Sequence, residues 1–318
     1  MIKIATLAAG VFYLLMLPAA QASDGFYVNP QSSAAQWVQH NPDTPATARI
    51  RSAIANVPSA LWLTGTSQAA DRLTDRVSRY VSAAASTDKI PILVAYNVPH
   101  RDCSGGASKG GAPDAAAYRT WIDHLITGIG SNPAVVILEP DALADMQCLG
   151  NDKRTERLRL LNYAVSGLKQ RAPHTDVYLD AGNPGWKSPA AMADTLNAAG
   201  VTQARGFALN IANFYTLAQV RSYGDAINSR LLSEFSYTKA IAVDTSRNGN
   251  GAIPGDWCNP PGRRLGIAPQ VLSPQLVALW IKLPGNSDGG ASPKTDCHGG
   301  PTAGTFSAEL ALRLIEGN

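Results

Sequence analysis

The apolar residues of this chain gather in short runs that alternate with longer stretches of helical periodicity. Seven runs have the length and aliphatic content of buried strands, and they lie at residues 60–63, 90–96, 134–138, 176–179, 206–210, 240–243 and 276–281. Helical spacing occupies most of the intervals between them, at residues 68–85, 115–129, 154–171, 189–199 and 217–235. Strands that alternate with helices are typical of parallel βα units.

This alternation predicts the fold class. Seven strands without a linker or a break in composition favour one α/β domain, a closed or nearly closed parallel (β/α) barrel like the TIM barrel. A doubly wound open sheet is the alternative. A polar lead-in at 23–45 and a helix at 46–56 precede the first strand. Two long Gly- and Pro-rich loops, 247–264 and 283–305, come late in the chain, and such loops usually carry function.

The third predicted strand runs into the sequence Leu138-Glu139-Pro140-Asp141. Because Pro140 cannot donate to a sheet ladder, the strand should end there and present Asp141 at its carboxyl end. Catalytic and ligand-binding residues of α/β proteins usually lie at that end of the sheet. Asp141 could equally cap a helix that begins at Ala142, and this stretch alone does not separate the two interpretations.

Polar residues follow five other predicted strands in the same way. Each one alone is explained equally well by a helix cap or a turn, but at six strand ends they would converge on one face of a barrel: Asp102, Asp141, Asp180, Asn210 with Asn213, Asp244, and Lys282 with Asp288. Carboxylates that share a site raise the pKa of at least one of them, which supplies a general acid at neutral pH. Such a cluster can cleave a glycosidic bond or hold Mg²⁺ or Ca²⁺.

Tryptophans favour a sugar as the substrate. Trp62 lies at the end of the first predicted strand, and Trp186 and Trp257 lie among Gly, Asn, Asp and Pro in loops on the same face. Flat aromatic faces can stack on the C–H faces of pyranose rings. No G-x-S-x-G motif supports a Ser-His-Asp triad. Carboxylates beside exposed indoles therefore predict a polysaccharide-binding groove.

Composition and charge exclude several classes of protein. The 318 residues are 45% apolar and 16% charged, which argues against wholesale disorder. The net charge of +3 is small and no Lys/Arg cluster suggests a basic groove, so we expect no nucleic-acid partner.

The N-terminus has the features of a secretory signal. Lys3 precedes an apolar core at 4–17 and an A-x-A site that ends at Ala22. The apolar core is shorter than the ~20 residues that a membrane span needs. We therefore expect residues 1–22 to be a signal peptide cleaved after Ala22. Residues 23–318 should form a single secreted catalytic domain, with no membrane association in the mature form.

Four cysteines remain in the predicted mature chain. In an exported protein an even number favours disulfides, and four cysteines allow three connectivities. None of their spacings resembles a zinc motif. Sequence neighbours suggest the pairs Cys103–Cys148 and Cys258–Cys297.

Taken together, seven motifs resemble those of glycoside hydrolase family six, the inverting β-1,4-glucanases that include endoglucanases and cellobiohydrolases. They occur in the family's order over essentially the whole mature chain: YNVPHRDC at 96–103, LEPDAL at 138–143, LDAG at 179–182, NIAN at 210–213, VDTSRNG at 243–249, DWCN at 256–259 and WIKLPGNSDG at 280–289. The resemblance implies a distorted seven-stranded α/β barrel and the same two disulfides.

The resemblance also implies roles for individual residues. Asp141 corresponds to the general acid, and Asp102 to the neighbour that keeps it protonated and relays a proton through water. Asp288 corresponds to a base that is disputed in the family, Tyr96 to the residue that distorts the sugar ring, and Ser108 to a residue that holds the attacking water. We expect substrate contacts from Trp62, Asp180, Asn183, Trp186, Asn210, Asn213, Asp244, Trp257, Lys282 and Asn286.

Three positions depart from the family pattern. Asn183-Pro184 stands where His-Ala or His-Ser is usual, Asn286 replaces a frequent glutamate, and His100 occupies a position that is often acidic. The first two can change substrate contacts and the pH optimum. We expect Glu139 to be a buried structural carboxylate without a catalytic role.

The resulting hypothesis is a secreted, monomeric, inverting endo-β-1,4-glucanase whose partner is a β-1,4-glucan polysaccharide and which needs no metal and no organic cofactor. Compact loops at 102–118 and between Cys258 and Cys297 favour an open cleft. A cellobiohydrolase is the alternative within the family. A catalytically silent glycan-binding protein and a metal-dependent hydrolase are the alternatives outside it.

Overall fold

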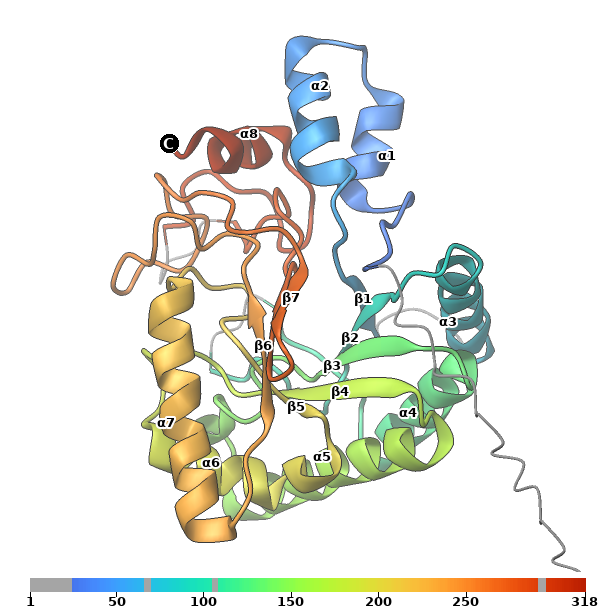
Figure 1. Ribbon diagram of the computed structural model, residues 1–318, viewed down its shortest axis with the longest axis vertical. Helices are drawn as coiled ribbons and strands as arrows, with labels where there is room; N and C mark the ends of the chain where they lie inside the picture. Colours follow the sequence, from blue (N-terminus) through green and yellow to red (C-terminus); the bar gives the residue numbers. More distant parts are fainter. Residues whose placement is uncertain (1–24, 66–69, 105–107, 291–295) are drawn as a thin grey trace, which may run out of the picture.

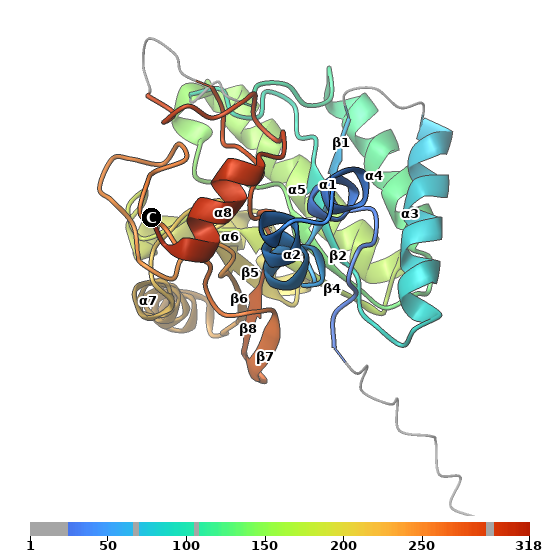
Figure 2. The same ribbon diagram turned by 90° about the horizontal axis from the view of Figure 1, so that it is seen from above.

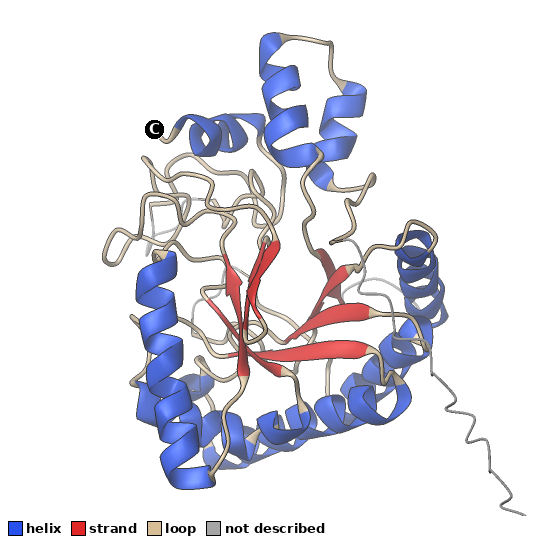
Figure 3. Ribbon diagram, viewed as in Figure 1, coloured by secondary structure: helices blue, strands red, loops and turns tan. Residues whose placement is uncertain are grey.

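The computed structural model describes residues 25–65, 70–104, 108–290 and 296–318. The predicted signal peptide, 1–22, lies outside these residues. Figure 3 shows a strongly curled sheet with helices along its outer side. Seven of its strands run parallel: β1 (Leu61–Thr64), β2 (Ile92–Tyr96), β3 (Ala134–Leu138), β4 (Thr175–Asp180), β5 (Gly206–Leu209), β6 (Ala240–Asp244) and β8 (Leu276–Leu279). The α/β class and the seven parallel strands that the sequence predicts are confirmed.

One further strand, β7 (Gln270–Ser273), was not predicted. It pairs antiparallel with β8 at the edge of the sheet, and the strand order is β1-β2-β3-β4-β5-β6-β8-β7. All four residues of β7 are exposed, so its sequence Gln-Val-Leu-Ser lacks the apolar run that marks a buried strand. The prediction of a sheet with seven strands is therefore one antiparallel strand short.

The sheet curls into an incompletely closed barrel. No ladder is described between β1 and β8, although the backbone N–H of Ala60 donates to the carbonyl of Trp280 at 3.0 Å. The indole Nε1 of Trp62 donates to the carbonyl of Ile281 at 2.8 Å beside it. This junction, which we name the seam, brings the first and last parallel strands together.

Helices cover the outer face of the sheet and cap one of its ends (Figures 1 and 2). The outer helices are α3 (Ala70–Ala85), α4 (Ala115–Ile129), α5 (Asn151–Arg171), α6 (Pro189–Ala198) and α7 (Leu217–Phe235). Near the carboxyl ends of the strands lie α1 (Ser33–His40), α2 (Pro45–Ile50) with a π-helical turn η1 (Arg51–Ala55), and α8 (Ala308–Glu316). Two 3₁₀ turns complete the set, η2 (Met146–Cys148) and η3 (Val201–Gln203).

Alternate side chains of each strand enter two different apolar clusters. In β2, Leu93 and Ala95 pack with the outer helices, whereas Ile92, Val94 and Tyr96 point into the curl of the sheet. Both sets are buried, which explains why the strands read as unbroken apolar runs. The inner set ends at Tyr96, where the polar loops begin.

No described helix is long and apolar enough to cross a membrane.

The outer cluster should dominate the stability of the fold. Phe207 in β5 is fully buried in this cluster, whereas Val271 in β7 is 70% exposed. We expect Phe207→Ala to lower the free energy of unfolding by about 3–5 kcal/mol, because it leaves a cavity. Val271→Ala should change it by no more than about 0.5 kcal/mol. Guanidinium unfolding of both variants measures the difference, and equal losses would contradict this assignment of the core.

Candidate active site

A cleft of about 800 Å³ lies at the carboxyl ends of the strands. Its walls come from the loops after the strands and from the segment around α1. Most of the predicted site residues line it: Trp62, Tyr96, Asp102, Ser108, Asp141, Trp186, Asn213, Trp257, Lys282, Asn286 and Asp288. The topology thus brings together residues that are more than two hundred positions apart in the chain.

Asp141 lies in a tight turn directly after β3. Pro140 ends the strand, and Asp141 adopts a positive φ of 68° that L-residues rarely use. Its backbone N–H donates to Oδ2 of Asp180 at 2.7 Å, and its carbonyl accepts from the N–H of Asp145 at 2.8 Å. Residues 141–145 form a turn and not a regular helix, so Asp141 faces the cleft from the end of a strand.

The surroundings of Asp141 favour its protonated form. Burial raises the pKa of Asp141 well above its usual value, and the negative charges of Asp180, Asp102 and Asp145 raise it further. The ammonium group of Lys282 opposes them and does not outweigh them. A carboxyl group that keeps its proton at neutral pH beside a cleft can act as a general acid.

The segment after β2 carries Asp102 and Ser108. One carboxylate oxygen of Asp102 accepts a hydrogen bond from the backbone N–H of Ser108. The buried Arg101 donates to the carbonyls of Tyr96 at 2.5 Å and Ser108 at 2.9 Å, and its guanidinium lies 4.4 Å from the centre of the Tyr96 ring. That ring also packs nearly perpendicular to the ring of Trp62, with 5.4 Å between ring centres. Tyr96 is therefore held rigidly where it meets the cleft.

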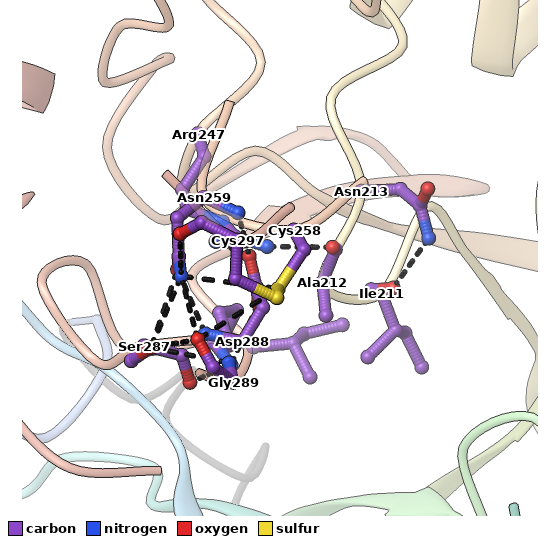
Figure 4. A network of polar contacts seen from close by, with 12 residues as sticks. Ile211, Ala212, Asn213, Arg247, Cys258, Asn259, Ser287, Asp288, Gly289 and Cys297 are labelled. Carbon is purple, nitrogen blue, oxygen red and sulfur yellow. Dashed lines mark hydrogen bonds and ion pairs between the residues drawn. A yellow bond between two sulfur atoms is a disulfide. The ribbon is translucent and has the colours of Figure 1, made fainter. Parts of the chain in front are cut away.

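Asp288 lies in an opposite electrostatic environment (Figure 4). Arg247 contacts Oδ2 of Asp288 at 2.7 Å, and Lys282 contacts Oδ1 at 2.9 Å. The backbone N–H of Asn259 donates to Oδ2 at 3.1 Å. Burial acts to raise the pKa of Asp288, but the charges of Arg247 and Lys282 outweigh burial and the pKa is lowered. Asp288 is thus a fixed anion with a weak affinity for protons.

Four predicted substrate-binding residues lie beneath the cleft: Asp180, Asn183, Asn210 and Asp244. Asp244 is fully buried and accepts N–H bonds at 2.9 to 3.3 Å from residues that follow three different strands: Ala212, Ser246, Ile281 and Lys282. Asn210 donates to the carbonyl of Asp244 at 3.0 Å. The side-chain oxygen of Asn183 accepts from the N–H of Gly185 at 2.9 Å. These side chains fix the loops that carry the cleft residues, and their direct contact with sugar stays a prediction.

Glu139 lies in the same layer beneath the cleft. Its carboxylate accepts N–H bonds of 2.8 Å from both Asn97 and Val98, which joins the end of β3 to the loop after β2. Burial raises the pKa of Glu139 to about 7, although these two backbone bonds oppose the shift. Because Glu139 is 1% exposed and does not line the cleft, it has a structural position.

The two predicted disulfides are present, Cys103–Cys148 and Cys258–Cys297. Figure 4 shows the second one beside Asp288, where Asn259 bridges the two loops by donating to the carbonyls of Gly289 and Cys297. Both pairs join loops that line the cleft.

Several cleft residues were missed by the sequence analysis. Gln31, Ser33 and Gln36 line the cleft, although their segment is polar and was expected only to lead into the fold. The hydroxyl of Ser33 donates to Asn286 at 2.6 Å. Asp145 also lines the cleft, and its spacing of four residues from Asp141 is the signal that could have identified it.

Comparisons with known proteins give matches over most of the chain. The family model "Glycosyl hydrolases family 6" matches residues 21–318. Endoglucanase 1 of Streptomyces halstedii is 44% identical over 94% of this chain and 93% of its own length. A probable 1,4-β-D-glucan cellobiohydrolase C of Aspergillus fumigatus is 32% identical over 92% of this chain and 76% of its own length.

A solved structure is also similar. The endoglucanase Cel6 from Mycobacterium tuberculosis, in complex with methyl-cellobiosyl-4-deoxy-4-thio-β-D-cellobioside, superposes with a TM-score of 0.83 at 40% identity. The alignment covers 92% of this chain and 97% of that one.

The proton affinity of Glu139 generates a prediction about stability. Burial raises its pKa to about 7 in the folded protein, compared with 4.5 for a free side chain. The folded state therefore binds this proton more tightly, so the stability from Glu139 is complete below pH 4.5 and is lost as the pH rises to about 7. The free energy of unfolding of the parent minus that of Glu139→Gln should fall by about 3 kcal/mol over this range.

Denaturant unfolding at a series of pH values measures this difference. Glu156→Gln on α5, where Glu156 forms a solvent-exposed pair with Lys153, is the matched control and should give a constant difference. A constant difference for Glu139→Gln as well would show that its proton affinity is unchanged by folding.

Proposed function

Since the chain belongs to glycosyl hydrolases family 6, we propose that it is an endoglucanase that cleaves internal β-1,4-glucosidic bonds with inversion and uses Asp141 as the general acid. Cellulose or a related β-glucan is the substrate. The observation that carries this proposal is the position of Asp141, which lines the cleft and whose pKa is raised by burial and by three neighbouring carboxylates. That environment is the one a glycosidase needs around its proton donor.

The cleft suits a chain of pyranose rings. Trp186 and Trp257 both line it and are 47% and 39% exposed, so their rings can stack on sugar faces. Trp62 is anchored through its indole N–H and leaves part of its ring to the cleft. The thio-linked cello-oligosaccharide in the Mycobacterium tuberculosis enzyme supports a β-1,4-glucan as the occupant.

The proposed reaction combines protonation of the glycosidic oxygen with attack of water on the opposite face of the sugar. Asp141 gives its proton to the glycosidic oxygen as the bond from that oxygen to C1 breaks. A water molecule attacks C1 from the opposite face and forms the new C–O bond, which inverts the anomeric centre. The rigid ring of Tyr96 restricts the sugar at the cleavage point to a distorted shape.

The proton of the attacking water needs an acceptor. Asp288 is poorly suited to this role, because Arg247 and Lys282 lower its pKa and engage both of its oxygens. We therefore assign Asp288 to electrostatic stabilisation of the oxocarbenium-like transition state. The proton passes through water toward Asp102, whose carboxylate also binds the N–H of Ser108.

We also propose that the protein is secreted as a monomer, with residues 1–22 as the signal peptide and 23–318 as the catalytic domain. Two disulfides are typical of proteins that fold in oxidising compartments, which supports this location.

Asp141→Ala tests the assignment of the general acid. We expect kcat on soluble cello-oligosaccharides to fall by a factor of about 10²–10⁴, because the variant lacks the carboxyl group that we propose as the donor to the leaving oxygen. NMR of the first product of the parent should show the α-anomer. Asp225→Ala, on the exposed side of α7, should behave as the parent. Full activity of Asp141→Ala would remove this residue from its role, and a β-anomer would exclude inversion.

The mode of attack on polymer is tested with carboxymethylcellulose. An endoglucanase cuts at internal bonds, so viscosity should fall steeply while few reducing ends form. The same assay on a chain-end enzyme gives a slow fall in viscosity and a steady release of disaccharide, and that result would favour the cellobiohydrolase alternative. Binding without any release of sugar would indicate a silent glycan-binding protein.

A further inference from the structure

We propose that Asp145 is a positioning residue of the active site, which holds the segment from Asp102 to Ser104 against the turn that carries Asp141. The inference rests on the proposed function and deepens it, because it concerns how the proton donor and its neighbour are kept together. Asp145 belongs to none of the motifs that predicted the site. It lines the cleft and is only 8% exposed.

The turn after β3 places Asp141 and Asp145 on the same side of the backbone. The N–H of Asp145 donates to the carbonyl of Asp141 at 2.8 Å, which closes the turn. The two carboxyl groups lie close enough to interact, since the negative charge of Asp145 contributes to the raised pKa of Asp141. Like charges at this spacing are unfavourable unless a function or a partner compensates them.

The partner is Ser104, in the segment that follows β2. Oδ1 of Asp145 accepts a hydrogen bond from the hydroxyl of Ser104, and Oδ2 accepts from its backbone N–H at 3.3 Å. Both oxygens of one side chain thus bind one residue, which fixes that residue in position and orientation. Ser104 is two residues from Asp102, so the contact determines where the Asp102 carboxylate stands.

Two other links hold the same pair of segments at different points. The buried Arg157 donates from α5 to the carbonyls of Pro99 and His100 at 2.9 and 2.8 Å, and to that of Ala142 at 3.2 Å. The Cys103–Cys148 disulfide joins the segments covalently beside Ser104. Neither link reaches the cleft, whereas Asp145 does. Asp145 therefore differs from Arg157 and from the disulfide in two ways. It places a negative charge at the cleft surface, and it fixes the orientation of Ser104 there.

The charge of Asp145 also acts on Asp141. The titratable groups that interact with Asp141 come from several elements: Tyr96 at the end of β2, Asp102 after it, Asp145 in its own turn, Asp180 from β4 and Lys282 after β8. The cation Arg157 interacts with Asp145 as well. Removing the negative charge of Asp145 should make Asp141 easier to ionise. The charge of Asp145 and its contact with Ser104 can be separated by mutation.

Asp145→Asn removes the charge and keeps an oxygen that can accept from Ser104. We expect the alkaline limb of the kcat/KM profile on a soluble cello-oligosaccharide to move to lower pH by about 0.5–1 unit. Asp225→Asn makes the same change of charge on the exposed side of α7 and should leave the profile unchanged. An Asp145→Asn profile that superposes on that of the parent would overturn the role of the charge.

Ser104→Ala removes the hydroxyl and keeps the charge. We expect kcat to fall about threefold to tenfold with KM nearly unchanged and no shift of the alkaline limb, because the Asp102 segment loses its fixed position. The double variant Ser104→Ala/Asp145→Ala should have the same kcat as Asp145→Ala, since both changes break one contact. Losses that multiply in the double variant would overturn the contact.

Hydrogen exchange gives a readout that needs no activity. The amide of Ser108, which donates to Asp102, should exchange faster in Ser104→Ala and in Asp145→Ala than in the parent. Unchanged exchange in both variants would refute the positioning role, even in an active enzyme. A parent that hydrolyses no β-1,4-glucan but shows faster exchange in the variants would refute the proposed function and leave the positioning role standing.

Discussion

The site depends on buried carboxylates that accept backbone N–H groups from neighbouring strand ends. Glu139 binds the two residues that follow β2, Asp180 binds the backbone of Asp141, and Asp244 binds residues that follow β5, β6 and β8. The carboxyl ends of parallel strands leave these N–H groups without ladder partners, and an unpaired buried N–H costs about 1–3 kcal/mol. A carboxylate beneath the cleft satisfies several of them at once, so the loops above adopt one arrangement.

This arrangement creates two carboxyl groups with opposite proton affinities in one cleft. Asp141 has anionic neighbours and a raised pKa, whereas Asp288 has two cationic neighbours and a lowered one. The difference comes from which side of the cleft each residue occupies, because the arginine and the lysine belong to the loops after β6 and β8. A carboxyl group with a raised pKa and a carboxylate with a lowered pKa therefore coexist in one cleft.

Much of the fold could be predicted from the sequence, because strands buried on both faces appear as unbroken apolar runs. The runs at 134–138 and 206–210 marked β3 and β5 to within one residue. β7 could not be found in this way, since its four residues are exposed. Pairing with β8 makes it a strand, and a hydrogen-bonded ladder leaves no trace in the residue types.

The site was predicted through residue types and their order along the chain. As with β7, contacts between distant residues could not be predicted from residue types. Asp141 and Asp244 both follow strands, yet one faces the cleft and the other is fully buried beneath it. Sequence does not separate them, because the number of backbone N–H groups that converge on a side chain depends on how several strands end. The α1 segment could not be assigned to the cleft, since its contact with the loop at Asn286 spans 253 positions.

The seam between β1 and β8 has a mechanical consequence. Every other junction between neighbouring parallel strands is a ladder of several backbone bonds, whereas here no ladder is described and the connection includes single bonds at Ala60 and Trp62. A hydrogen bond contributes about 1 kcal/mol net, so this junction resists separation least. The sheet is therefore a barrel that is open between β1 and β8, and this opening lies beside Trp62 and Lys282. Elastic strain imposed by a stiff glucan chain would concentrate at that opening and spare the paired strands that carry Asp141.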